Sequence, residues 1–119
     1  FDPDLYEPGD YGIDSGRLAM EALLERRPDI DAVFCASDRM AQGALETAYR
    51  RGRRVPDDLL VMGFDDHELA KLTDPPLSTI RQPIRDVGRT AMESLLAAMA
   101  GENPPDIVFP VDLVIRGST

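Results

Sequence analysis

Cysteine, lysine and histidine are scarce in this chain of 119 residues, and each scarcity excludes a class of protein. The single cysteine, Cys35, cannot form an internal disulfide, so the chain is not a small disulfide-stabilised secreted scaffold. Its 22 acidic residues outnumber 13 basic ones and give a net charge of −9. That excess argues against a basic face that grips a phosphate backbone. A reducing compartment, the cytoplasm, is the expected location.

Long apolar runs are also missing. No run approaches the roughly 20 residues that a membrane helix needs, and the start of the chain is acidic and broken by proline, unlike a signal peptide. We therefore expect no membrane partner. The 43% hydrophobic residues suffice for a core, which predicts a single compact domain over residues 1–119. The chain opens inside an apparent loop, so we expect it to be part of a longer protein.

Hydrophobic periodicity predicts that helices and strands alternate along the chain. Helical stripes of apolar residues lie at about 14–27, 38–50, 67–73 and 84–99. Continuous apolar runs typical of buried strands lie at 31–36, 59–64, 77–82 and 107–115. Asp14 or Ser15 is the expected N-cap of the first helix, Gly52 the expected end of the second, and Pro110 places the last strand at an edge or bulge. This order predicts an α/β fold with an open, mostly parallel sheet and helices on both faces.

Polar residues follow the predicted strands at the edge where parallel sheets bind ligands. Ser37 and Asp38 follow the first strand, Asp65 follows the second, Gln82 ends the third, and Tyr11 lies in the loop before the first helix. Carboxylates and amides bind hydroxyl groups, and an aromatic ring packs on an apolar C–H face. This set of side chains is therefore typical of a site for a hydroxyl-rich ligand.

Simpler interpretations of the same residues remain open. Asp38 and Asp66 are also ordinary helix N-caps, and periodicity alone favours that role. Three aspartates near the strand ends could hold Mg²⁺, but Lys71 is misplaced for a phosphotransfer receiver. Cys35 falls inside a predicted buried strand, so an inert thiol is favoured over a nucleophile. His67 is favoured as an exposed residue at a helix start rather than a ligand contact. We expect no metal, no cofactor and no catalysis.

Two further patterns suggest phosphate or nucleic acid and are rejected. The glycines at 9, 12 and 16 precede a helix, but their spacing is wrong for a phosphate loop, no lysine accompanies them, and two aspartates lie between them. The arginines at 50–54 lack interleaved aromatics and end a helix, where positive charge suits the helix dipole. A solvated helix end is the expected role of that run.

Ordered motifs along almost the whole chain resemble the C-terminal part of LacI/GalR-family bacterial transcriptional repressors. These motifs are CASDRMAQGAL at 35–45, VPDD at 55–58, VMGFDD at 61–66, PPLSTIRQP at 75–83 and LVIRGST at 113–119. The resemblance implies most of the C-terminal lobe of a periplasmic-binding-protein-like effector domain. The operator-binding helix-turn-helix head, the N-terminal lobe and the first strand and helix of this lobe would then lie outside these residues.

The resemblance also implies roles for individual residues. Tyr11 matches the aromatic that stacks on the effector, Asp65 the cleft aspartate, and Gln82 a further polar contact. Ser37 stands where asparagine is common, which removes an amide donor and implies a different effector or a water-mediated contact. Asp38 lies beside the cleft or holds the start of the helix.

The implied function is effector binding and dimerisation in a repressor, with a sugar or related polyol as the effector and operator DNA bound only by the missing head. The family dimerises through this lobe, for which an apolar set of residues is suited: Met40, Ala44, Leu69, Leu72 and Thr73. The alternative is an exported sugar-binding protein of a transport system with the same fold. A doubly wound enzyme or phosphoreceiver has only the acidic strand ends in its favour.

Overall fold

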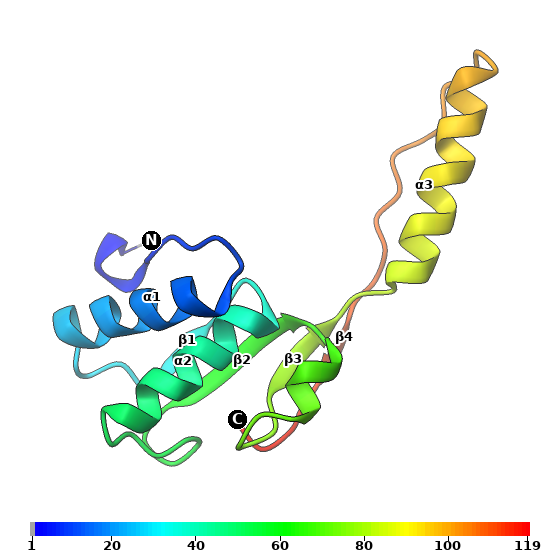
Figure 1. Ribbon diagram of the computed structural model, residues 1–119. Coiled ribbons are helices and arrows are strands. Elements are labelled where there is room, and N and C mark those ends of the chain that lie inside the picture. Colours follow the sequence, from blue (N-terminus) through cyan, green and yellow to red (C-terminus); the bar gives the residue numbers. More distant parts are fainter. Residues whose placement is uncertain (1) are drawn as a thin grey trace.

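Parallel pairing dominates the sheet of this protein. The computed structural model describes residues 2–119, and its strands lie in the order β1-β2-β3-β4 (Figure 1). They span Ala32–Phe34, Leu60–Asp65, Ser78–Arg81 and Asp112–Val114. β1, β2 and β3 run parallel, whereas β4 pairs with β3 in antiparallel orientation. The predicted α/β class with a mostly parallel sheet is confirmed.

Helices α1 (Ile13–Arg26) and α2 (Asp38–Arg50) lie side by side in close contact. Glycine makes this approach possible, because a Cβ atom at Gly16 would collide with the backbone of Met40, and one at Gly43 with that of Ile13. Gly52, at φ +72°, follows the end of α2 as predicted. The predicted caps of α1 are wrong: Gly12 is its N-cap and has no side chain to offer.

The hydrophobic core lies between these two helices and one face of the sheet. Its apolar members are Met20, Leu24, Cys35, Met40, Ala41, Ala44, Leu45, Ala48, Leu59, Val61, Ala70 and Leu77. Burial raises the pKa of the Cys35 thiol to about 12, so the sulfur stays protonated at neutral pH. The prediction of an inert core cysteine is confirmed.

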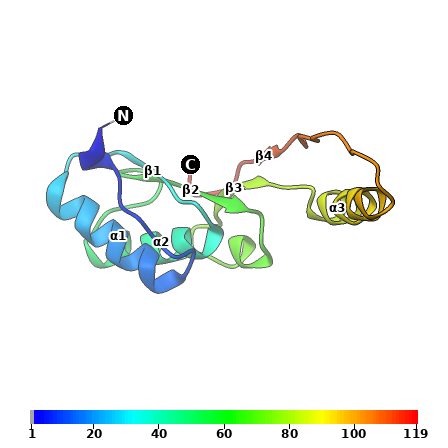
Figure 2. The same ribbon diagram turned by 90° about the horizontal axis from the view of Figure 1, so that it is seen from above.

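The helices cover only one face of the sheet, which differs from the prediction of helices on both. Figure 2 shows α1, α2 and the short 3₁₀ helix η2 (Glu68–Lys71) on the same side. The other face carries alternate strand residues such as Phe34, Phe64 and Leu113, and none of α1, α2 and η2 covers it. The Phe34 and Phe64 rings meet edge to face, with centroids 6.3 Å apart.

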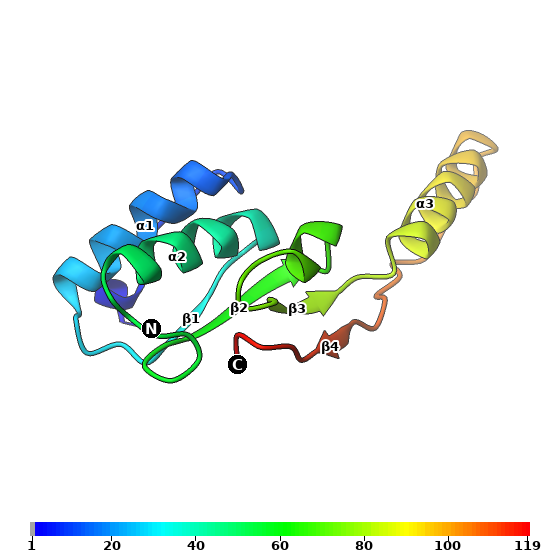
Figure 3. The same ribbon diagram turned by 60° about the horizontal axis from the view of Figure 1, so that its bottom comes forward.

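Helix α3 (Ile84–Met99) stands apart from the sheet, whereas the sequence predicts helices packed on the faces of the sheet. The chain leaves β3, forms α3, and returns through extended residues to β4 (Figure 3). No residue of α3 is buried, and the molecule measures 57 × 29 × 22 Å along its principal axes. The apolar stripe of α3 is present as predicted, but periodicity does not say which surface the stripe packs against.

The last residues of the chain form hydrogen bonds to the sheet. The Oγ atom of Ser118 donates to the carbonyl oxygen of Val61 at 2.6 Å and accepts from the amide of Ser78 at 2.8 Å. β4 is shorter than the predicted strand, and it begins after Pro110 at the edge of the sheet. Within residues 2–119, no helix has both the length and the apolar character needed to cross a bilayer.

Candidate ligand-binding site

A polar cavity of about 410 Å³ lies at the carboxyl ends of β1 and β2. Its lining comes from the loop before α1, the start of α2 and the end of β2. The lining residues are Asp10, Tyr11, Gly12, Ser37, Asp38, Arg39, Asp65 and His67. The structure therefore brings four of the five predicted ligand-binding residues to one hollow, and it places the fifth, Gln82, in contact with one of them.

Tyr11 presents its side chain to solvent from a strained position. Its φ of +65° is unusual for a residue with a Cβ atom, and 65% of its surface is exposed. The turn around it is fixed by the Asp10 carboxylate, which accepts from the amide of Gly12 at 2.8 Å. The hydroxyl of Ser15 contributes too, because its Oγ accepts from the Asp10 amide and donates to the Gly12 carbonyl. These hydrogen bonds to Asp10 lower the pKa of its carboxyl group.

Ser37 is the N-cap of α2, and only 5% of its surface is exposed. Its Oγ accepts from the amide of Met40 at 3.1 Å and donates to the carbonyl oxygen of Tyr11 at 3.1 Å. The hydroxyl is therefore occupied on both its donor and its acceptor side by the protein itself.

Asp38 is almost fully buried, with 1% of its surface exposed, and faces the sheet. Its two carboxylate oxygens accept from the hydroxyl of Thr79 at 2.5 Å and from the amide of His67 at 2.6 Å. Gly63 faces it, where a Cβ atom would collide with the carboxylate. Loss of water around the carboxylate raises the pKa of Asp38 despite these hydrogen bonds. The interpretation of Asp38 as an N-cap is wrong, because it ties α2 to β3 and to the turn after β2.

Asp65 ends β2 in a conformation that few residues with side chains adopt, with φ at +114°. Its Oδ1 accepts from the Nε2 of Gln82 at 2.7 Å. Because one amide hydrogen occupies a single lone pair, the carboxylate retains capacity for further donors. Asp65 therefore combines access from the cavity with unused acceptor sites, as does the exposed Asp10, whereas Asp38 is buried and occupied.

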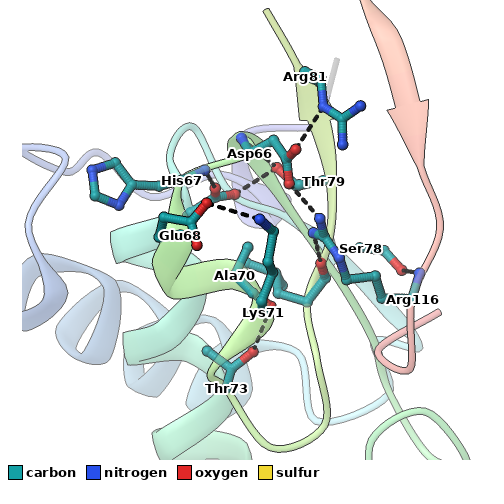
Figure 4. A network of polar contacts seen from close by, with 12 residues as sticks. Asp66, His67, Glu68, Ala70, Lys71, Thr73, Ser78, Thr79, Arg81 and Arg116 are labelled. Atoms are coloured by element: carbon teal, nitrogen blue, oxygen red, sulfur yellow. Dashed lines mark hydrogen bonds and ion pairs between the residues drawn. The ribbon is translucent and has the colours of Figure 1, made fainter.

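Asp66 points away from the cavity and forms an ion cluster that the sequence analysis missed (Figure 4). Its carboxylate accepts from Arg81 at 2.6 Å and from Arg116 at 2.5 Å. Burial opposes the charge of Asp66, but the hydrogen bonds from both guanidinium groups outweigh it and lower the pKa of the carboxyl group. The alternative of an Asp66 N-cap is wrong, since His67 precedes η2 and offers no side-chain cap.

Arg39 and His67 complete the cavity wall and were not among the predicted site residues. The imidazole of His67 points away from the Asp66 cluster in Figure 4. Within residues 2–119 neither side chain has a hydrogen bond or an ion pair at contact distance, although the charge of Arg39 helps to lower the pKa of Asp10. Their position in the sequence could have placed them at the site, because Arg39 follows Ser37-Asp38 and His67 follows Asp65-Asp66.

A second hollow of about 470 Å³ lies between α1 and β1, but its walls differ in character. It is lined mainly by apolar side chains, among them Leu5, Ala19, Met20, Leu23 and Phe34. A hydroxyl-rich ligand would leave its polar groups unsatisfied there. The polar cavity at the strand ends is therefore the candidate site.

A third hollow, of about 570 Å³, lies on the outer side of α2. Three of the residues that line this hollow belong to the predicted dimer surface: Leu69, Leu72 and Thr73. The other two predicted members, Met40 and Ala44, are in the core, where they face α1 and the sheet and are closed to a partner. The adjacent Tyr49, 85% exposed, was not predicted for this surface.

The arginines at the end of α2 were expected to be solvated, but they also make contacts within the chain. Arg51 bonds Glu21 and Glu25 of α1, while Arg53 donates to backbone carbonyls and Arg54 pairs with Asp58. In the part of the chain that the structure describes, no three His, Cys, Asp or Glu side chains lie close enough to hold a metal ion.

The sequence is similar to those of known proteins along almost its whole length. The profile of the periplasmic binding protein-like domain family matches residues 2–119. The HTH-type transcriptional repressor CytR of Escherichia coli (strain K12) is 44% identical over 120 residues, which cover 99% of this chain and 35% of that protein. The chain thus spans about a third of the length of the curated relatives it matches, CytR and CelR of Thermobifida fusca among them.

Solved structures share the fold. The transcriptional regulator CelR in complex with cellobiose superposes with a TM-score of 0.93 and 40% identity, covering 100% of this chain and 37% of the CelR chain. The lac repressor dimer bound to operator and the anti-inducer ONPF gives a TM-score of 0.86 and 35% identity, covering 93% of this chain and 39% of that chain.

Proposed function

The chain belongs to the periplasmic-binding-protein-like domain family, and we propose that it forms the effector-binding and dimerisation part of a LacI-type transcriptional repressor. The observation that carries this proposal is the cavity in which the exposed ring of Tyr11 and the partly free carboxylate of Asp65 face the same space. Its relatives CytR, CelR and the lac repressor are transcriptional regulators, which favours this role over an exported sugar-binding protein.

A sugar or related polyol is the proposed effector. Sugar hydroxyls donate to carboxylates, and the apolar face of a sugar ring packs on an aromatic ring, so Asp65 and Tyr11 provide complementary contacts. Gln82 contributes indirectly by orienting Asp65. The CelR structure is a complex with cellobiose, which makes cellobiose a suitable first probe. We propose that the protein binds its effector without catalysis, in the cytoplasm.

The proposed mechanism couples this cavity to the missing DNA-binding head through movement of two lobes. Residues 2–81 and 112–119 contain the sheet and α1 and α2, and we assign them to one lobe. The segments that join β3 and β4 to α3 are the connections along which the second lobe attaches. An effector that binds between the lobes changes their relative position. Operator DNA then changes effector affinity by the same factor by which the effector changes operator affinity.

Two protomers are proposed to associate through the outer side of α2 and η2. Leu72 is 80% exposed there, next to Tyr49 and Leu69, and an exposed apolar group of this kind is costly unless a partner covers it. The arrangement suits a homodimer in which the same patch from both protomers meets about a two-fold axis.

The test uses the full-length parent protein. Calorimetry with cellobiose and lactose measures effector binding, and a DNA fragment selected from random sequence measures operator binding. Tyr11→Ala and Asp65→Ala are each expected to weaken sugar binding at least about tenfold, a loss of about 1.4 kcal/mol, and to leave DNA binding in place. Asp31→Ala, an exposed aspartate outside the cavity, is the matched control.

Unchanged sugar affinity in both variants would contradict the assignment of the site. A parent protein that selects no DNA sequence would contradict the repressor function. A protein that binds DNA but no member of a panel of monosaccharides, disaccharides and polyols would contradict the proposed effector class.

A further inference from the structure

We infer that Ser37 is a positioning residue, which holds the backbone of Tyr11 in its left-handed conformation and does not itself contact the ligand. The inference rests on the proposed function, since it assumes that Tyr11 forms the aromatic wall of the sugar site. It replaces the expectation that Ser37 meets the effector directly or through water.

The first support is the hydrogen bonding of the hydroxyl. A serine hydroxyl has one hydrogen to donate, and that of Ser37 goes to the carbonyl oxygen of Tyr11 at 3.1 Å. The same oxygen accepts from the amide of Met40 at 3.1 Å. Ser37 lines the cavity, but only 5% of its surface is exposed, which leaves a ligand little access to the one lone pair that remains. A ligand hydroxyl would have to displace a bond that the protein already makes.

The second support is the conformation of Tyr11. A left-handed φ of +65° costs a residue with a Cβ atom about 1–2 kcal/mol, so it persists only where surrounding contacts hold it. The peptide that follows Tyr11 is held at its N–H, because the amide of Gly12 donates to the carboxylate of Asp10, whose own amide donates to Ser15. Ser37 supplies the hydrogen bond to the carbonyl of Tyr11 itself, from a different element of the fold.

The third support is the close packing between the segment around Tyr11 and the start of α2, where Ser37 lies. The turn before α1 and the start of α2 lie against each other because Gly9 and Gly16 both contact Met40 closely. Since Ser37 caps α2, its Oγ is fixed relative to the helix axis. The hydrogen bond from Ser37 therefore ties the backbone of Tyr11, from which the ring projects, to the start of α2.

The test is a double-mutant cycle in the full-length parent with cellobiose as the probe. Ser37→Ala removes the hydrogen bond and is expected to weaken cellobiose binding about tenfold. In the Tyr11→Ala background the same substitution is expected to have no further effect, because Ser37 acts only through Tyr11. Ser37→Thr keeps the donor and the cap and is expected to restore binding. Ser37→Gly keeps most of the capping stability but not the donor, so it should behave like Ser37→Ala in binding.

A second readout does not require a ligand. Hydrogen exchange of the segment 10–16, followed by mass spectrometry, is expected to accelerate in Ser37→Ala and Ser37→Gly and to stay unchanged in Ser37→Thr. Equal losses of affinity with and without Tyr11 would overturn the inference and make Ser37 a direct contact. Unchanged exchange in Ser37→Ala would overturn it as well. A Tyr11→Ala variant with normal cellobiose affinity would instead overturn the proposed site, and accelerated exchange in Ser37→Ala would still support the structural link.

Discussion

Gln82 donates a hydrogen bond from its Nε2 to the Oδ1 of Asp65 at 2.7 Å, and so connects the candidate site to the segment that leads into α3. Asp65 closes β2, and Gln82 follows β3 just before the chain leaves the sheet. A ligand that bonds Asp65 therefore acts on a carboxylate that the connecting segment already holds. Under the proposed function, this contact links effector binding to the segment that leads into α3.

Replacing Gln82 by glutamate tests this link. At pH 7 the Gln82→Glu variant places two carboxylates in contact, and their repulsion should displace Asp65 and weaken cellobiose binding about tenfold. Calorimetry of the full-length variant at pH 7 measures this, with Asn103→Asp as an amide-to-acid control outside the site. An affinity in Gln82→Glu equal to that of the parent protein would show that the contact plays no part in binding.

The sequence predicted the elements and the edge of the sheet that carries the site, because both follow from local patterns. Apolar periodicity located α1, α2 and α3, the strand ends located Asp65, and Tyr11 was placed by its loop before the first helix. Side-chain roles were harder to predict, since Ser37 and Asp38 are both common N-caps and only the tertiary contact with Thr79 decides between them. The roles of adjacent polar residues at the start of a helix can be distinguished only when their tertiary contacts are known.

Contacts between residues far apart in the sequence, and the surface that covers an amphipathic helix, could not be predicted from the sequence. Arg116 reaches Asp66 across 50 residues of chain, and no motif spacing indicates that pair. Helix α3 shows the opposite problem, because its amphipathic stripe was predicted correctly yet none of its residues is buried within residues 2–119. An amphipathic pattern establishes that a face is buried somewhere, without establishing which surface covers it.

The cluster of Asp66 with Arg81 and Arg116 should stabilise the fold at neutral pH. Asp66→Asn leaves the largely buried Arg116 without its carboxylate partner, and we expect a loss of about 3 kcal/mol in the free energy of unfolding. Arg116→Gln should cost more than Arg81→Gln, because Arg116 is 14% exposed whereas Arg81 is 51% exposed and partly screened. Urea denaturation of the three variants gives the comparison, and equal small losses would show that the cluster contributes no more than a surface ion pair.

The lowered pKa of Asp66 fixes the direction of its pH dependence. A carboxyl group whose folded-state pKa lies below the unfolded value of 3.8 stabilises the protein fully above pH 3.8. That contribution is lost as the pH falls through the folded-state pKa, because both states then bind the proton. The difference in unfolding free energy between the parent and Asp66→Asn should therefore be constant near neutral pH and shrink below about pH 3.8. A difference that grows on acidification would contradict the ion-pair assignment.

Asp38 should show the opposite dependence, since burial raises its pKa. In the Asp38→Asn variant an amide oxygen can accept from the His67 amide while the amide nitrogen donates to Thr79, so the contacts survive without a charge. As pH rises from below 3.8 through the raised folded-state pKa, the parent loses stability relative to this variant. Denaturation at a series of acidic pH values measures the difference, and Asp31→Asn controls for the loss of one surface charge. A difference that does not change with pH would contradict the raised pKa.

The proposed dimer surface gives a prediction that does not depend on the ligand. Leu72→Glu places a charge at a position that is 80% exposed in the protomer, so the fold should be retained. If the same position is covered in the dimer, the buried charge should raise the dissociation constant at least about tenfold. Sedimentation velocity of the parent protein over a concentration series measures this. Leu18→Glu, an equally drastic change at an exposed position on α1, should leave the dimer intact. Persistent dimers in both Leu72→Glu and the double variant with Leu69→Glu would place the interface on another face of the molecule.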